Sequence, residues 1–164
     1  VSLDNGTLNI EQEDNSRLNA TGKISVYVSA PIFIRLKASG ASEIHGQNIL
    51  SADAAISVVV SGASEAEMHL KAPSVTGEMT GASKLRLSGQ TKALRIDGTG
   101  ASKAFCYTRL AENTSVDLSG ASHAEVFASV KLDAEASGAS GVLYKGNATV
   151  SQRTSGAASV NKSD

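Results

Sequence analysis

Apolar and polar side chains alternate along most of the chain with a period of two residues. Ile34, Leu36 and Ala38 alternate with Arg35 and Lys37, and stretches of the same kind recur up to about residue 143. This period is typical of β-strands that bury one face and expose the other. No apolar run approaches the roughly 18 residues of a membrane-spanning helix, so we expect no transmembrane segment.

The alternating stretches are punctuated by a small tetrapeptide, Ser/Thr-Gly-Ala-Ser, which recurs along the chain. Its glycines, the last one in a degenerate copy, are Gly40, Gly62, Gly81, Gly100, Gly120, Gly138 and Gly156. They lie 22, 19, 19, 20, 18 and 18 residues apart, a period too short for helical hairpins or propeller blades. It suits one coil of a β-solenoid, so we predict an all-β, single-stranded parallel β-helix with 18–22 residues per coil.

Stacking explains why the tetrapeptide is small. If coils lie about 4.8 Å apart, equivalent residues form rows along the axis, and a row of glycines lets the chain bend where a Cβ would clash. Alanine and serine are then expected to fill the narrow space that is left, whereas a row of seven nucleophilic serines makes no chemical sense. Each coil is predicted to carry two strands and a short variable segment, such as residues 88–92 or 111–113, that absorbs differences in coil length.

Composition agrees with a thin, periodic core. Ala, Ser and Gly together supply 63 of the 164 residues, while aromatic residues supply 4% and Trp is absent. The formal charge of -1 gives no basic excess, so we expect no nucleic-acid partner. The single cysteine, Cys106, excludes an internal disulfide or a cysteine-based metal cluster, and its inward position predicts a buried, inert thiol.

The whole chain, residues 1–164, is predicted to form one β-helix domain. Residues 1–35 would supply N-terminal strands or first coils, with a turn at Asp4-Asn5-Gly6 and a strand in which Ile24, Val26 and Val28 alternate with polar residues. Residues 36–150 would hold the regular repeats. Residues 151–164, in which polar side chains replace apolar ones, would form a C-terminal cap. No signal peptide is visible, so we expect a mature or trimmed chain.

Four carboxylates occupy the outward position three residues before successive glycines. They are Glu78, Asp97, Asp117 and Glu135. Spaced by roughly 5 Å, such a row could bind a divalent cation or a glycan. The alternative is a solvated face whose repulsion is relieved by screening and by Arg95.

Scarce aromatic side chains gather in the C-terminal half. Phe105, Tyr107, Phe127 and Tyr144 are candidate binding residues, because exposed aromatics on a β-helix can stack on sugars or contact a protein partner. The alternative is that the phenylalanines pack against the variable segments. Vertical ion pairs are expected between Glu65 and Lys84 and between Glu67 and Arg86. The histidines, His45, His69 and His123, lack metal-ligand spacing, and we expect no metal and no cofactor.

A family resemblance follows from three stretches of the sequence. Residues 5–10 (Asn-Gly-Thr-Leu-Asn-Ile), the proline-terminated residues 24–31 and the serial tetrapeptides resemble the bacterial family called putative auto-transporter adhesin, head GIN domain. The resemblance implies a right-handed β-helix, a location in the cell envelope, whether periplasmic or extracellular surface, and no catalytic residues. Members usually carry a further segment before the first strand, so the first coil is expected to be incomplete.

These observations favour a non-catalytic envelope or surface module that binds a glycan or a protein through an outer ladder face. One alternative is a polysaccharide-active β-helical lyase or hydrolase, but such enzymes need long loops that wall a groove, and coil lengths vary here only from 18 to 22 residues. Another alternative is a structural spacer or a regulatory envelope domain. Self-association through the ends or sides of the coils is a further expectation.

Overall fold

The computed structural model describes residues 1–11, 22–106 and 111–163. The chain divides into two compact units, Val1–Ala30 and Pro31–Asp164. All regular elements of the described residues are β-strands, so the predicted all-β class is confirmed.

The first unit contains a small hairpin. Strands β1 (Ser2–Asp4) and β2 (Thr7–Asn9) pair antiparallel through a turn in which Asn5 and Gly6 have φ values of 45° and 75°. This left-handed pair is the geometry that Asn-Gly favours in two-residue hairpins, as the sequence predicted.

The strand expected at residues 24–28 is not formed. Residues 22–30 contain no strand, and the side chains of Ile24 and Val26 are 57% and 54% exposed. Alternation shows only that one side of a segment could be buried, whereas a strand also needs a neighbour for its backbone hydrogen bonds. In the described part of this unit, β1 and β2 pair with each other.

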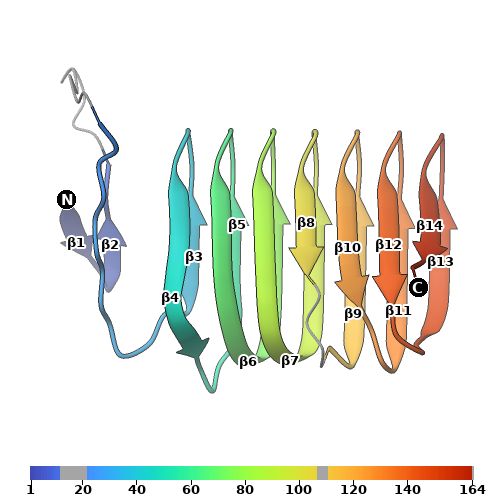
Figure 1. The fold of residues 1–164 in the computed structure, drawn as a ribbon, viewed down its shortest axis with the longest axis horizontal. Coiled ribbons are helices and arrows are strands. Elements are labelled where there is room, and N and C mark those ends of the chain that lie inside the picture. The colour runs from blue at the N-terminus through green and yellow to red at the C-terminus, as the bar shows by residue number, and fades with distance from the viewer. Residues whose placement is uncertain (12–21, 107–110, 164) are drawn as a thin grey trace. The chain divides into compact units, whose positions relative to one another are not determined.

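The second unit is a parallel β-solenoid, which confirms the predicted architecture (Figure 1). Its chain winds into stacked coils, and each strand pairs with the equivalent strand of the neighbouring coil. The strands are β3 (Arg35–Ala38), β4 (Glu43–Ser51), β5 (Ile56–Val60), β6 (Glu65–Met79), β7 (Lys84–Gly98), β8 (Lys103–Cys106), β9 (Asn113–Leu118), β10 (His123–Phe127), β11 (Lys131–Ala136), β12 (Gly141–Lys145), β13 (Thr149–Thr154) and β14 (Ser159–Lys162).

Each coil contributes a strand to two faces that meet at the glycine corner. The pre-glycine face contains β3, β5, residues 74–79 of β6, residues 93–98 of β7, β9, β11 and β13. The post-glycine face contains β4, residues 65–72 of β6, residues 84–91 of β7, β8, β10, β12 and β14. Alternate residues of both faces point inward and form one narrow core, in which Val58, Ile96, Val116 and Leu132 are buried.

The glycine corner requires glycine in every coil. The seven corner glycines have φ values from 74° to 83°, in the left-handed region. From Gly62 onward, a Cβ would lie 2.5–2.8 Å from the carbonyl oxygen of the corner glycine in the preceding coil. That oxygen accepts a hydrogen bond of 2.7–2.9 Å from the alanine N–H of the next coil. The backbones therefore meet at the corner itself, with no space for a side chain.

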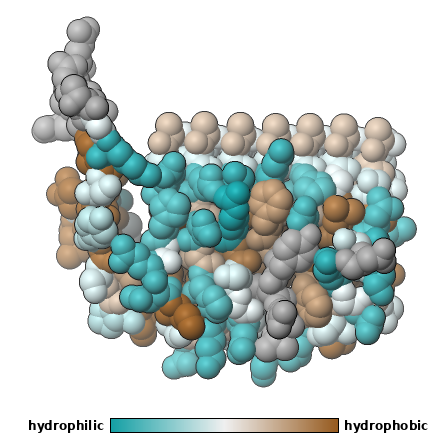
Figure 2. All heavy atoms as spheres, viewed as in Figure 1, coloured by the Kyte–Doolittle hydropathy of each residue, from teal (hydrophilic) through white to brown (hydrophobic). Residues whose placement is uncertain are grey.

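Serine and alanine of the tetrapeptide take opposite sides of the corner. The last serine points inward and is buried in most coils, as at Ser122, whose hydroxyl donates to the carbonyl of Ser119 at 2.9 Å. The alanines point outward and form an exposed row, which we call the alanine ridge; it consists of Ala41, Ala63, Ala82, Ala101, Ala121, Ala139 and Ala157. The ridge appears as a row of pale brown spheres along the upper edge of Figure 2. The expectation that both residues fill interior space is therefore wrong for alanine.

Differences in coil length are not confined to the variable segments. In the longest coil, β4 uses Gly46, Gln47 and Asn48 where β6 uses only Met68, because β4 is bulged between His45 and Ile49. By contrast, β6 and β7 pair through residues 71 and 72 with residues 90 and 91, where a loop was expected. Both coils are 19 residues long, so their strands continue around the far corner without a break.

The last coil replaces two apolar inward residues of the pre-glycine face with polar ones, while Val150 and Val160 still pack against the core. Gln152 and Thr154 of β13 stack on Ala134 and Ala136 of β11, and both are exposed. The interior is therefore less apolar in this coil than in the coils before it.

Candidate functional site

The predicted carboxylate row lies on the pre-glycine face. Glu78, Asp97, Asp117 and Glu135 are direct neighbours in consecutive coils. Two of them have guanidinium partners: Arg95 Nε donates to Asp97 Oδ2 at 2.8 Å, and Arg153 pairs with Glu135. The row is therefore partly neutralised by side chains of the same face.

Arg95 lies beside this row, two residues before Asp97 on the same strand. Its hydrogen bond and charge interaction with Asp97 raise the pKa of the guanidinium, and Asp117 and Glu78 act in the same direction. Within residues 1–11, 22–106 and 111–163, no group of three or more His, Cys, Asp or Glu side chains could hold a metal ion. The arrangement is that of a flat polar face, and cation binding along it stays a prediction.

The structure brings two of the four candidate aromatics to one surface. Phe105 and Phe127 are half-buried on the outward side of the post-glycine face, in adjacent coils. The guanidinium carbon of Arg86 lies 5.5 Å from the centre of the Phe105 ring, within the range of a cation–π contact. Tyr144 stacks on the buried Val126 and packs against the core from an inward position. Tyr107 lies outside the described residues.

Most outward side chains on the first four coils of the post-glycine face are charged, and they lie in two parallel rows. The first row, three residues after each glycine, runs Glu43, Glu65, Lys84, Lys103. The second row, five residues after each glycine, runs His45, Glu67, Arg86, Phe105. The charge changes from negative to positive at the same step in both rows, from Glu65 to Lys84 and from Glu67 to Arg86.

Glu65 is the centre of the ion pairs at this step. Lys84 Nζ lies 3.5 Å from Glu65 Oε2, which confirms the expected pair. Arg86 also pairs with Glu65 rather than with Glu67, so the second expected pair is wrong. Arg86 lies over Phe105 in the next coil and reaches diagonally to Glu65, whose two oxygens serve one cation each.

A shallow groove runs between the alanine ridge and the first charged row. It has a volume of about 360 Å³ and is open to solvent. Its lining consists of Ala41, Ala63, Ala82, Ala101, Ser64, Ser83, Glu43, Glu65, Lys84 and Lys103. Such a groove could receive side chains of a partner, but it has no walls that would enclose a small substrate.

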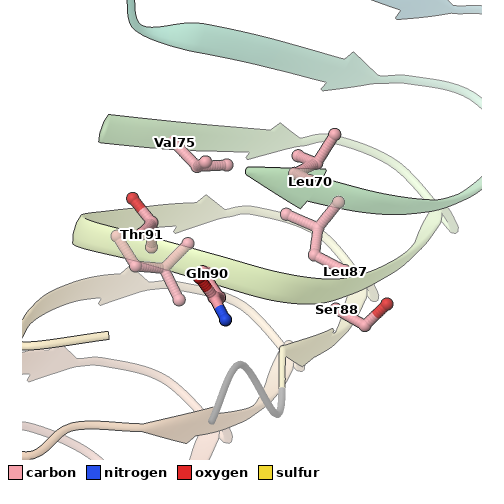
Figure 3. Close-up of a pocket in the computed structure, with 7 residues that line it drawn as sticks. Leu70, Val75, Leu87, Ser88, Gln90 and Thr91 are labelled. Atoms are coloured by element: carbon pink, nitrogen blue, oxygen red, sulfur yellow. The ribbon is translucent and has the colours of Figure 1, made fainter. Parts of the chain in front are cut away.

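A second space lies inside the coils, beside the far corner of β6 and β7. Leu70, Val75 and Leu87 point into it, and Thr91 closes one side (Figure 3). It has no room for a water molecule. This space is a packing gap of the core and not a binding site.

The remaining candidate groups are the single cysteine and two of the histidines, and none of them has the surroundings of a reactive group. Cys106 is fully buried, and burial raises the pKa of its thiol to about 12, as the expected inert thiol requires. His45 Nε2 lies 3.4 Å from Glu43, and His123 Nε2 lies 3.5 Å from Glu125. Each of these two histidines thus has a carboxylate neighbour on its own strand.

Sequence reasoning predicted the pairs Glu65–Lys84 and Glu67–Arg86 but missed that the charge reverses at the same step in both rows. Reading the third and fifth residues after each glycine as pairs, coil by coil, would have shown the reversal. The exposed alanine ridge was also missed, because period-two alternation does not say which side of a left-handed corner faces solvent.

Comparison with protein families places the chain beside a described family. The family model for the putative auto-transporter adhesin, head GIN domain, matches residues 1–148. Comparison with curated proteins and with solved structures found no match. The described residues include no helix that is long and apolar enough to cross a membrane.

Proposed function

This chain belongs to the putative auto-transporter adhesin, head GIN domain family, and we propose that it is a non-catalytic module of the bacterial cell surface that binds a glycan or a protein. The family's adhesin description agrees with a surface β-solenoid. The proposal extends this to binding through an outer ladder face.

The observation that carries the proposal is the open, repetitive exterior. Equivalent side chains of successive coils lie side by side in straight rows, as in Glu78, Asp97 and Asp117. Rows of this kind offer the same chemistry at a regular spacing of about 4.8 Å. An extended glycan or an extended protein segment can contact several coils at once, whereas a small substrate would contact only one.

Phe105 and Phe127 are the residues we expect to anchor the partner. Both are half-buried on the outside of the coils and do not belong to the core. An aromatic ring fixed on a strand loses little conformational entropy on binding, and its face can stack on a sugar ring or pack against a protein side chain. The carboxylate row on the pre-glycine face would add a polar or cation-assisted contact.

The geometry gives less support to a polysaccharide-active enzyme. A glycosidase places two carboxyl groups on opposite sides of the bond that it cleaves, within a cleft. Here the candidate carboxylates share one flat row, and Asp97 and Glu135 are paired with arginines. The groove beside the alanine ridge is open rather than walled.

Binding of immobilised glycans and envelope proteins tests the proposal. We expect Phe105→Ala/Phe127→Ala to lose at least about tenfold in affinity, which corresponds to about 1.4 kcal/mol. Tyr27→Ala is the matched control, because it removes a 79% exposed aromatic that lies in the first unit, outside the coils. Binding that survives the double substitution would refute the aromatic anchor, and a wild-type chain that binds neither class of ligand would refute the function.

Calorimetric titration with calcium tests the carboxylate row separately. If cations assist binding, the wild-type chain should release or absorb heat, and Glu78→Gln/Asp117→Asn should abolish the signal. Lys37→Gln, on the same row, is the control and should leave the signal unchanged. The absence of heat up to millimolar calcium would remove the cation from the proposal.

A further inference from the structure

The sign reversal on the post-glycine face makes that face complementary to itself. In the first two coils its outward rows carry Glu43, Glu65 and Glu67, and in the next two coils they carry Lys84, Lys103 and Arg86. Three negative charges are thus followed by three positive charges along the stack. The distance from the first to the fourth coil is about 14 Å, given the usual strand spacing.

We propose that this face binds a second copy of the chain in antiparallel orientation, as a two-fold symmetric dimer. The axis would pass between the coils of Glu65 and Lys84, perpendicular to the stack. Glu43 of each copy then faces Lys103 of the other copy, Glu65 faces Lys84, and Glu67 faces Arg86. Every carboxylate meets a cation, as an isologous interface requires.

Other arrangements of two copies satisfy fewer charges. A parallel copy in register would place Glu43 and Glu65 against the same residues of its partner and would place the cations against cations. A parallel copy shifted by two coils would pair half of each face and leave the other half unpaired, which leads to open chains of molecules. The antiparallel dimer alone pairs both halves and closes.

The surface beside the rows permits close approach. The alanine ridge carries no side-chain atom beyond Cβ, so the long charged side chains are the groups that project nearby. The groove of about 360 Å³ between the ridge and the first row spans the same four coils. It could receive the lysine stems of the partner, whose methylene groups would cover the alanine methyls.

The expected dimer is weak and sensitive to salt. Lys84 and Arg86 already pair with Glu65 within one chain, so the second copy adds partners chiefly for Glu67 and Lys103. Neither of these two side chains has an ion pair with another described residue. A contact of four short strands falls below the ~1,200 Å² that stable interfaces bury, and exposed ion pairs contribute less than about 1 kcal/mol each.

Solution mass as a function of concentration and salt gives the first test. At about 0.1 M salt we expect the average mass to rise toward twice that of the chain as concentration increases. At about 1 M salt, where the Debye length falls from about 10 Å to about 3 Å, the dimer should dissociate. A monomer at every concentration and at low salt would overturn the proposal, and so would a dimer that salt does not weaken.

Charge reversal gives the second test and separates charge pairing from loss of folding. Lys84→Glu/Lys103→Glu makes the first row acidic throughout, and Glu43→Lys/Glu65→Lys makes it basic throughout. Each variant alone should be monomeric, while an equal mixture should form dimers more tightly than the wild type. Lys37→Glu, on the pre-glycine face, is the control and should leave the mass unchanged. Failure of the two folded variants to associate on mixing would overturn the proposal.

Cross-linking tests the orientation. A mixture of Glu43→Cys and Lys103→Cys chains should form an intermolecular disulfide, whereas either chain alone should not. Cys106 will not interfere, because it is fully buried. Equal cross-linking of Glu43→Cys with itself would indicate a parallel pair and refute the antiparallel one. These measurements need no ligand, so a negative result is distinguishable from failure of the proposed binding of glycan or protein, although both proposals use the face that carries Phe105.

Discussion

Replacing a corner glycine with alanine can separate two contributions to stability. One is the cost of a left-handed backbone conformation, and the other is the steric contact of the new Cβ with the preceding coil. Gly100 has φ of 83°, and a Cβ there would lie 2.8 Å from the carbonyl oxygen and 3.1 Å from the nitrogen of Gly81. Gly40 has nearly the same φ, 77°, but no atom of the described chain lies within 4 Å of its Cβ position. The pair therefore differs in contact and not in backbone conformation.

The magnitudes follow from this geometry. A left-handed conformation costs an alanine about 1–2 kcal/mol, and both variants incur that cost. Gly100→Ala must also separate two coils by a few tenths of an ångström, which weakens the 2.9 Å hydrogen bond from Ala101 to Gly81. With the steric term, we expect a total loss of about 3–5 kcal/mol for Gly100→Ala and about 1–2 kcal/mol for Gly40→Ala. The effect of alanine on the unfolded chain is common to both and cancels in the difference.

Urea and thermal unfolding of the wild-type chain and the two variants provide the assay. A difference of about 2 kcal/mol between them corresponds to about 4–8 °C in Tm for a chain of this size. Equal destabilisation by both substitutions would show that backbone conformation alone accounts for the glycine. A Gly100→Ala variant as stable as the wild type would refute the close stacking of the corners.

Two further predictions concern the interior. Ser122→Ala should lose about 1–2 kcal/mol of stability in urea unfolding, because the Ser122 hydroxyl donates to Ser119. Ser83→Ala should be neutral or slightly stabilising, because the buried Ser83 hydroxyl has no partner among the described residues. A larger loss of stability for Ser83→Ala than for Ser122→Ala would contradict this reasoning. The raised pKa of Cys106 means that the unfolded thiol loses its proton first as pH rises, so stability should fall between about pH 9 and pH 12 by up to about 1.4 kcal/mol per pH unit. Unfolding at several pH values should show a shallower decline for Cys106→Ala, and parallel declines would show that the thiol does not contribute.

The repeat made most of the solenoid predictable. Once the glycines are aligned, period-two alternation assigns each neighbouring residue to the inside or the outside, and the observed rungs, such as Asp97 with Asp117, follow that alignment. The turn at Asn5-Gly6 could also be predicted, because a two-residue hairpin is a local structure with its own sequence preference.

The features that the sequence did not predict depend on contacts between neighbouring coils or strands, which the alternation of apolar and polar residues does not specify. The bulge between His45 and Ile49 arises because the first coil must match a shorter neighbour, and nothing within the coil marks where the extra residues go. Arg86 pairs with Glu65 and not with Glu67, its direct neighbour in the preceding coil, because the long arginine side chain can also reach the residue diagonally across from it. Residues 24–28 alternate like a strand, yet alternation cannot supply the neighbour that a strand requires.

The unbroken pairing of β6 with β7 has a consequence for how the length of this protein can change. The two coils are both 19 residues long and match residue for residue around most of the circuit, so each is interchangeable with a copy of the other in backbone terms. Duplication or deletion of one such segment in the gene would move the two ends apart or together by about 4.8 Å while leaving every other coil with an intact neighbour. The length of the coil stack can therefore change during evolution in fixed steps of one coil, without redesign of the surfaces that we propose to bind a partner.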